Sequence, residues 1–509
     1  MPYQPIKGFA PDADPSEPGV LTDCNALLPT LNGVKTIPSN VDSDFSVIAS
    51  TAASGASVTK LDGTNEIYVA TKGTTSTIYK LTSTTWTNFK NGGGTYSANS
   101  AAQWTFAQYG DIILAAQKGD KIQRTSTATA SFTSMSVSSG MFKARIVETV
   151  LDFAVAFNID DSDLTGPIYG DAPDRWLCSA AGNVSDWTTS IATQSTSGRL
   201  TDYPGEITAA KRLGSNLVAY KQQSMFLGQY VGVPEVWRFR AIPGDGLGTW
   251  GPFSVVSIET AHLFWGFDNA YLYDGTRPIP IGTNRVAKWF FENLNIAEAD
   301  KMIGYHDRQE FRVIWYFPSG ADATLDRYVA YNYRSDRWAQ GGGGGFPLDV
   351  QAVFEYRPTS VTYDGLNTLY AATAYDDLPA SSYDDWVPTT GTPVWAVVED
   401  TFGSNRLRFV NGNPGIGRLT TWNIGTDDKI TVVDRIRPRF KTAPTIGLQQ
   451  YIYSDVHGGD ETTLNGIASL FRGGFDRVHA ARWQKFKQEY VGEMELLGID
   501  YRAQIDSEE

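Results

Sequence analysis

The feature that most constrains this chain is a hairpin pattern that recurs over roughly the first three quarters of its sequence. Each copy has a strand of alternating apolar residues, a tight polar turn, a second strand, and a third strand that ends in an aromatic residue. Copies begin at Gly214, Ala261 and Gln309, about 47 residues apart, which is the length of one four-stranded propeller blade. Because so small a sheet cannot bury its apolar face alone, we expect neighbouring copies to stack around a common axis.

Further copies begin at Asn65, Gly110 and Asn367, and residues 144–157 hold a divergent copy. Aromatic residues make up 13% of the chain, and 49 glycines and 24 prolines supply turns between the apolar runs. Aromatic and β-branched side chains pack well on a pleated sheet, so this composition favours strands over helices. We therefore predict an all-β fold with a β-propeller of about six or seven blades over residues 45–380.

The repeat fades towards both ends of the chain. Residues 1–40 are rich in proline, and we expect them to form an extended arm laid over the body. We assign residues 41–384 to the propeller and residues 385–509 to a C-terminal β-rich domain that acts as a platform or interface. A short helix is predicted for residues 284–294, with Thr283 as its cap, because its apolar residues share one helical face.

The formal net charge of −14 is concentrated in the middle of the chain. Basic and acidic residues number 9 and 10 in residues 1–140, 23 and 34 in residues 141–430, and 10 and 12 in residues 431–509. Such a surface repels nucleic acid, so we predict no tight binding of DNA. An acidic wall would nevertheless suit a channel through which DNA slides without sticking, and ordinary solubilising charge is the simpler alternative.

The two cysteines, Cys24 and Cys178, are too few for a disulfide framework and indicate folding in a reducing cytoplasm. The first residues lack the basic start and apolar stretch of a secretory signal. The most apolar run, around Val150–Phe157, is too short to cross a bilayer, so we expect no membrane association.

Motifs of enzyme chemistry are absent from the sequence. None of the four histidines lies in a metal-binding or nucleophile-activating motif, and we expect no cofactor. Gly246, Gly248 and Gly251 match the G-x-G-x-x-G pattern of dinucleotide sites. That site requires a helix after the glycines, whereas Pro252 and a strand follow here, so we interpret the match as a turn between blades.

Two groups of carboxylates deserve comparison with known sites. Asp160, Asp161 and Asp163 could hold calcium, but the loop lacks the later glycine and glutamate of an EF-hand, and a solvated loop explains them. Asp384 and Asp385 could in principle serve a glycosidase, which needs two carboxylates at a fixed separation across a sugar. One sequence cannot identify such a pair.

A row of alternating cations runs through residues 435–441. On a strand, Arg435, Arg437, Arg439 and Lys441 all point to one face, where four unpaired charges would repel one another. We expect them to pair within the chain or across a subunit boundary, and docking to a different protein or contact with DNA are the alternatives. Late glutamates offer candidate partners: Glu489, Glu493 and Glu495.

A second basic stretch follows within residues 472–487, interleaved with aromatic residues. Its members are Arg472, Arg477, Arg482, Lys485 and Lys487, with Phe475, Trp483 and Phe486 between them. The spacing within residues 475–490 is roughly helical, but we predict a loop that leads into a strand. Cations with aromatics suit either nucleic acid or an assembly interface. We regard Arg472, Arg477, Arg482 and Trp483 as interface candidates, together with the row at residues 435–441.

Several segments resemble a family of virion proteins. The first is FAPDADPSEPGVLTDCNALLPTLNGVKTIPS from Phe9, which resembles the N-terminal arm of phage structural proteins. Others are RWLCSAAGNVSDWTT from Arg175, GSNLVAYKQQSMFLGQY from Gly214 and GLGTWGPFSVVSIETAHLFWGFDNAYLYDG from Gly246. Together they are similar to nozzle, or tail hub, proteins of short-tailed bacteriophages, over most of residues 9–340.

The resemblance implies a structural role in the virion tail rather than catalysis. Nozzle proteins form a six-fold ring below the portal and its adaptor ring, conduct the DNA at ejection, and carry spikes, fibres or a tail needle. Two alternatives remain: a propeller that binds or cleaves glycans, and a propeller-type virion protein of a long-tailed phage. A funnel at the propeller centre with convergent carboxylates and aromatics would favour the glycan alternative.

Overall fold

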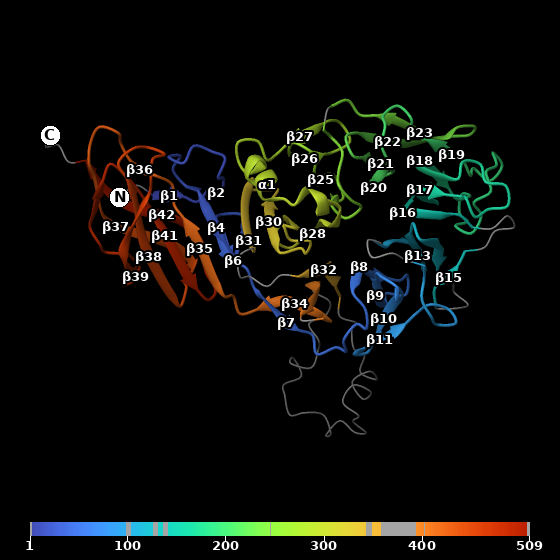
Figure 1. The fold of residues 1–509 in the computed structure, drawn as a ribbon, viewed down its shortest axis with the longest axis horizontal. Coiled ribbons are helices and arrows are strands. Elements are labelled where there is room, and N and C mark those ends of the chain that lie inside the picture. Colours follow the sequence, from blue (N-terminus) through green and yellow to red (C-terminus); the bar gives the residue numbers. More distant parts are fainter. Residues whose placement is uncertain are drawn as a thin grey trace, which may run out of the picture.

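The structure is a computed structural model that describes residues 3–97, 103–125, 131–135, 141–244, 246–342, 349–357, 393–401 and 403–505. In these residues almost all regular structure is β-strand, and the helical elements are α1 (Ala287–Asn293) and one 3-10 helix (Ile296–Lys301). Small sheets surround a common centre, and a two-layered unit lies beside them at one end of the molecule (Figure 1). The prediction of an all-β propeller is confirmed.

The propeller sheets follow one another along the chain, and strands adjacent in sequence pair antiparallel within each sheet. The first sheets are β8 (Ala52–Thr59), β9 (Asn65–Thr71), β10 (Ile78–Thr82) and β11 (Thr85–Asn88), and then β12 (Thr105–Tyr109), β13 (Ile112–Gln117), β14 (Asp120–Arg124) and β15 (Thr133–Ser134). One bridge joins β14 to the next group, β16 (Lys143–Val150), β17 (Phe153–Asp160), β18 (Asp171–Cys178) and β19 (Ser197–Arg199).

The later sheets repeat this arrangement. They are β20 (Ile207–Leu213), β21 (Asn216–Lys221), β22 (Met225–Gly232) and β23 (Val236–Ala241), then β24 (Val256–Ser257), β25 (His262–Trp265), β26 (Ala270–Tyr273) and β27 (Pro278–Pro280). After these come β28 (Ile303–Asp307), β29 (Arg312–Phe317), β30 (Arg327–Asn332) and β31 (Arg337–Gly342), and finally β32 (Val350–Tyr356), β33 (Val394–Thr401) and β34 (Ser404–Gly412).

The first strands of successive sheets contact one another in a closed circuit, β8–β12–β16–β20–β24–β28–β32–β8. The last sheet is completed from the other end of the sequence, because β7 (Ser39–Asp42) pairs antiparallel with β34. The chain therefore closes the propeller by placing one N-terminal strand on the outside of a sheet built from residues 350–412. Closure covers the apolar faces that the first and last sheets of an open row would leave exposed.

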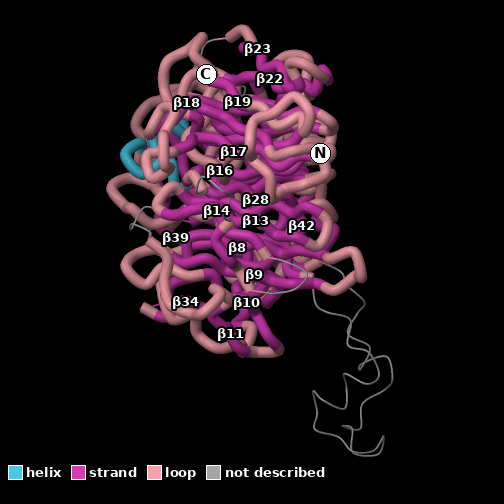
Figure 2. The backbone as a smooth tube through the Cα atoms, turned by 90° about the vertical axis from the view of Figure 1, so that its right-hand side faces the viewer, coloured by secondary structure: helices cyan, strands magenta, loops and turns pink. Residues whose placement is uncertain are grey.

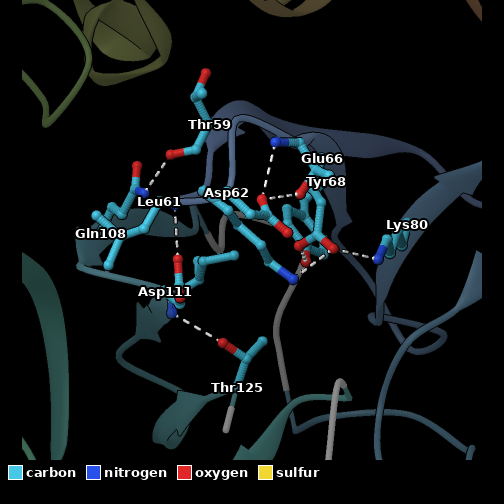
Figure 3. A network of polar contacts seen from close by, with 12 residues as sticks. Thr59, Leu61, Asp62, Glu66, Tyr68, Lys80, Gln108, Asp111 and Thr125 are labelled. Carbon is cyan, nitrogen blue, oxygen red and sulfur yellow. Dashed lines mark hydrogen bonds and ion pairs between the residues drawn. The ribbon is translucent and has the colours of Figure 1, made fainter. Parts of the chain in front are cut away.

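Neighbouring sheets are also joined by polar contacts at their turns. The turn between β8 and β9 meets the turn between β12 and β13, where the backbone N–H of Leu61 donates to Asp111 at 2.8 Å (Figure 3). Within the first sheet the carboxylate of Glu66 forms ion pairs with Lys60 and Lys80 at 2.7 and 2.6 Å, and it accepts a hydrogen bond from the hydroxyl of Tyr68. The charges of Lys60, Glu66 and Lys80 are thus compensated within the hairpin, and no bound ligand is needed to account for them.

The C-terminal part forms a β-sandwich into which the N-terminal strands are woven. One sheet has the order β40 (His479–Ala481), β37 (Thr431–Thr442), β42 (Glu495–Ile505), β6 (Val34–Thr36) and β5 (Leu27–Pro29), with β1 (Tyr3–Pro5) also on β42. The other has the order β39 (Thr462–Ser469), β38 (Ile446–Ser454), β41 (Trp483–Val491), β35 (Ile416–Thr420) and β4 (Asp23–Asn25), with β36 (Ile424–Gly425) on β41.

Propeller and sandwich share a continuous apolar core. One cluster of buried residues includes Ile436 and Phe486 of the sandwich, Leu27 of the N-terminal segment, and Trp315 and Trp338 of the propeller. The N-terminal segment lies between the two units, because β4 and β5 both contact β31. The two units are therefore packed together through the first 40 residues.

The short helix differs from the sequence prediction in its cap. α1 lies within the predicted residues 284–294, but the side chain of Thr283 accepts a hydrogen bond from Asn269 and does not cap the helix. The carboxylate of Asp12 does so instead, accepting from the backbone N–H groups of Lys288 and Trp289 at 2.7 and 3.1 Å. The sequence could not reveal this contact, because the two partners lie far apart along the chain.

Residues 475–490 were predicted as a loop leading into a strand, and this is confirmed by β40 and β41. Among the described residues no helix has the length and apolar character needed to span a bilayer. The hairpin predicted from Asn367 and the carboxylates Asp384 and Asp385 lie outside the described residues.

Candidate assembly surface

The predicted row of cations lies on β37, between β40 and β42 in the sandwich. Arg437, Arg439 and Lys441 are exposed and Arg435 is half-buried, while Ile436 turns to the core. The alternation expected of a strand thus holds along most of the row, although bulges interrupt the pairing of β37 with β42.

Most of these cations are paired within the chain, though mostly with partners other than those predicted. Arg435 pairs with Asp476 at 2.6 Å, Arg439 with Asp500 at 2.5 Å and Lys441 with Glu495 at 3.0 Å. The hydrogen bond to Glu495 raises the pKa of Lys441. Glu489, predicted as a partner for this row, pairs with Arg418 of β35 instead, at 2.9 Å. The structure records no ion pair for Glu493 in the part of the chain that it describes.

Arg437 is the exception in the row. In the described residues it forms no ion pair, and its stem lies against the loop that links β39 to β40: a Cβ added to Gly474 would meet its Cγ at 3.2 Å. The guanidinium therefore lies at the surface with no ion-pair partner among the described residues. Such a charge is available to a partner.

Some residues of the second basic stretch form polar contacts within the chain, whereas others form no ion pair among the described residues. The indole N–H of Trp483 donates to Asp427 at 2.7 Å and its ring packs on His457, so it is engaged within the chain. Lys485 pairs with Glu461 at 2.5 Å. Arg482, next to Trp483, is exposed and forms no ion pair in the described residues.

Arg472 and Arg477 lie in the same loop as Gly474 and form no ion pair among the described residues. The guanidinium of Arg472 lies 5.2 Å from the centre of the Phe471 ring. Arg477 lies over β39, because a Cβ added to Gly466 would come within 2.9 Å of its Nη1. The loop thus carries cations between the edge strand β39 and the row on β37.

Apolar side chains are exposed around the same cations. Ile467, Phe471 and Val478 are 63%, 64% and 67% exposed, respectively. We call the surface formed by these three residues with Arg437, Arg472 and Arg477 the basic end. Arginine and exposed aromatic residues are the side chains enriched where proteins meet. The sequence analysis identified its arginines, but it missed the apolar residues, because their exposure depends on where the sheet ends.

One cavity of the propeller gives a different picture. It has a volume of about 220 Å³ and lies where β8, β28 and β32 begin, and its lining includes Lys72, Gln103, Asp300 and Lys301. Burial lowers the pKa of Lys72 and raises that of Asp300. The described lining has one carboxylate and no aromatic residue, so it lacks the pair of acids and the sugar-stacking face that a glycosidase needs.

The carboxylates of the acidic loop after β17 form ion pairs and hydrogen bonds within the protein. Asp161 pairs with Arg175 at 2.6 Å, with both side chains buried, and it accepts a hydrogen bond from the N–H of Gly170 at the same distance. Asp163 pairs with Lys143 at 2.7 Å. Among the described residues no group of three or more potential ligands is arranged to hold a metal ion. These contacts account for Asp161 and Asp163 without a metal ion, but the prediction of a solvated loop is wrong for Asp161, because its side chain is only 2% exposed.

The glycine pattern at residues 246–251 precedes β24 and no helix, as predicted for a turn between sheets. Gly248 is required by a close approach of two backbones, since a Cβ there would lie 1.8 Å from the carbonyl oxygen of Gln222. The motif therefore serves packing.

Comparison with known proteins gives no family. No protein-family profile matches the chain, and no curated protein matches it. Solved structures do resemble it. One is the extracellular domain of a putative hybrid two-component system from B. thetaiotaomicron, with a TM-score of 0.42, 9% identity, and coverage of 87% of this chain and 47% of that one. Another is YCF48 bound to D1 peptide, with a TM-score of 0.36, 8% identity, and coverage of 75% and 97%. A third is the computationally designed Ika8 protein, with a TM-score of 0.36, 8% identity, and coverage of 73% and 100%.

Proposed function

We propose that this chain is a structural subunit of a bacteriophage tail, a nozzle or hub protein that assembles with copies of itself below the portal and its adaptor ring. The observation that carries the proposal is the basic end, where arginines without an internal ion pair surround exposed apolar side chains on an outward edge of the sandwich. The resemblance of the segments from Phe9, Arg175, Gly214 and Gly246 to nozzle proteins agrees with it.

The architecture suits such a mechanical role. The propeller is closed by β7, and the sandwich is fastened to it by the N-terminal strands and by a shared core, so load on one unit passes to the other. In this proposal the acidic middle of the chain faces the path of the DNA, where its charge prevents the phosphates from sticking. The remaining surface offers edges and loops to spikes, fibres or a tail needle.

The test is to locate the chain in the phage that encodes it. Purified particles would be analysed by quantitative mass spectrometry and imaged with gold-labelled antibodies raised against the recombinant chain. The proposal expects a fixed copy number per particle, in six-fold register with the adaptor, and label at the tail tip. Absence from particles, or specific hydrolysis or binding of glycans by the free chain, would contradict it. Label along a long tail would assign the chain to the other class of virion protein.

A further inference from the structure

We propose that copies of this chain join head to tail, with the basic end of one copy docked on an acidic surface at the opposite end of the next. This inference rests on the proposed function in one respect, namely that the chain assembles with itself. It adds which two surfaces meet and excludes a contact between identical surfaces.

The acidic surface is formed by the loops around β18 and β19. Residues 160–206 carry eight carboxylates and two arginines. Both arginines are neutralised locally, because Arg175 pairs with Asp161 at 2.6 Å and Arg199 with Asp174 at 2.9 Å. Three further carboxylates pair with cations outside the segment, Asp171 with Lys118, Asp163 with Lys143 and Glu206 with Arg145. Asp160, Asp186 and Asp202 form no ion pair among the described residues, so the surface keeps a net negative charge.

Exposed apolar side chains accompany these carboxylates. Ile168, Tyr169, Ile191 and Tyr203 are 65%, 53%, 67% and 43% exposed. The ring of Tyr169 holds the guanidinium groups of Arg175 and Arg199 at 5.0 and 5.4 Å from its centre, so the loops are fixed relative to one another. We call the surface formed by Ile168, Ile191, Asp202 and Tyr203 the acidic end. Asp202 is exposed and forms no ion pair in the described residues.

The basic end has the complementary charge. Residues 435–441 and 471–482 together hold seven arginines and lysines, of which Arg435, Arg439 and Lys441 are paired within the chain. The other four cations, Arg437, Arg472, Arg477 and Arg482, form no ion pair among the described residues. Opposite charges steer two surfaces together and fix their register, while the exposed apolar groups on each side supply the area to be buried. A second copy of this chain therefore offers each end a surface of opposite charge that also carries exposed apolar side chains.

The placement of the two ends makes the contact intermolecular. In Figure 1 the sandwich lies at one end of the long axis and β16–β19 lie towards the other, and Figure 2 looks onto the latter end. One copy cannot bring its own two ends together. A contact between identical surfaces would instead oppose arginine to arginine or aspartate to aspartate, which costs free energy. Unlike surfaces that meet in this way generate a ring if the rotation closes.

The experiment uses two purified full-length variants. The basic-end variant carries Arg437→Glu, Arg472→Glu and Arg477→Glu, and the acidic-end variant carries Ile168→Lys, Ile191→Lys and Asp202→Lys. All six side chains are exposed or half-exposed at the surface, so both variants should keep the circular dichroism and melting temperature of the parent. Control variants Leu61→Lys, at an 80% exposed site, and Lys288→Glu, at a 77% exposed site, change surface charge elsewhere.

Sedimentation velocity on each variant and on their mixture decides the question. We expect the parent and the controls to self-associate, and each interface variant to associate at least about tenfold more weakly. The mixture should form a one-to-one complex, because it contains one intact end of each kind and both are used when the two variants join. High salt should weaken this complex.

Other results would overturn the inference. If the parent associates but the mixed variants stay monomeric, the contact lies elsewhere, and the tail role is untouched. If each variant alone still associates like the parent, these ends are not the interface. If the parent remains monomeric at tens of micromolar, copies of the chain do not join through these ends, and particle labelling alone decides the tail role.

Discussion

At the scale of single residues, the buried His262 takes both of its hydrogen-bond partners from a neighbouring sheet. His262 on β25 is fully buried, and its Nε2 lies 2.9 Å from the carbonyl oxygen of Arg212. A carbonyl only accepts, so Nε2 carries the proton, and Nδ1 accepts from the hydroxyl of Tyr220 at 2.8 Å. Both ring nitrogens of the neutral His262 therefore have a hydrogen-bond partner. Burial lowers the pKa of His262 to about 4.

This histidine predicts a specific loss of stability in acid. Between pH 6.5 and about 4 the unfolded chain takes up a proton that the folded chain refuses, so the free energy of unfolding falls as the pH falls, by about 3 kcal/mol for this group. Urea unfolding followed by tryptophan fluorescence at a series of pH values would measure it. The variant His262→Gln should show a shallower decline than the parent. Equal slopes in the two proteins would contradict the assignment.

Two neighbouring arginines of the row on β37 are expected to have different roles: Arg439 in stability and Arg437 in assembly. Arg439 neutralises Asp500, whose side chain is 5% exposed, so Arg439→Glu leaves a buried carboxylate facing a like charge and should cost about 2 kcal/mol of stability. Arg437→Glu should leave the free energy of unfolding within about 0.5 kcal/mol, because the residue has no partner to lose in the described chain. Chemical unfolding of both variants tests this. A loss of equal size at the two positions would show that Arg437 has a structural partner.

At the scale of elements, α1 depends on the N-terminal segment. Asp12 occupies the place of a cap for two backbone N–H groups of the helix. The variant Asp12→Ala should therefore lower the free energy of unfolding by about 1 kcal/mol. Asp14→Ala removes a nearby acceptor that serves only the N–H of Ser16, and provides the matched control. Chemical unfolding and cleavage of the N-terminal segment by a dilute protease would both report the loss. Equal protease resistance in the two variants would argue against this cap.

The hairpins were predictable from sequence, and the N-terminal strands were not. Strands such as β21 and β29 are apolar runs next to turn residues, with Gly214 before β21 and Pro318 and Gly320 after β29. Their ends can therefore be recognised from the local sequence. The strands β4, β5 and β6 have only three residues each, too few for a period. The partners of β4 and β6 are β35 and β42 from the far end of the chain, and β5 pairs with β6.

The basic end was likewise predictable from the sequence only in part. Alternating arginines on β37 can be recognised in the sequence because they follow the period of a strand. Their partners Asp476 and Asp500 could not, because an ion pair depends on the register of β42 and on the course of a loop. The exposure of Ile467, on the edge strand β39, and of Val478, in the loop before β40, likewise depends on how the strands are arranged in space.

At the scale of the whole molecule, closure of the propeller is the event that unites the chain. The first and last sheets meet where β8 packs on β32, and Gly55 lies against the ring of Phe354. A Cβ at Gly55 would come within 2.4 Å of that ring, which itself is buried. The absence of a side chain at this position therefore allows the two sheets to touch.

Filling that space should weaken the closed fold. Gly55→Val is expected to lower the free energy of unfolding by about 2 kcal/mol, because the ring must move out of a packed core. Gly415→Val is the control, since nothing lies within 4 Å of a Cβ there. The decisive comparison is the double variant Gly55→Val with Phe354→Ala, in which the valine occupies space vacated by the ring. Its loss should be smaller than the two single losses added, as measured by urea unfolding. Strict additivity would mean that the two residues do not share the closing contact, and that the propeller is held together by β7 and the other sheets alone.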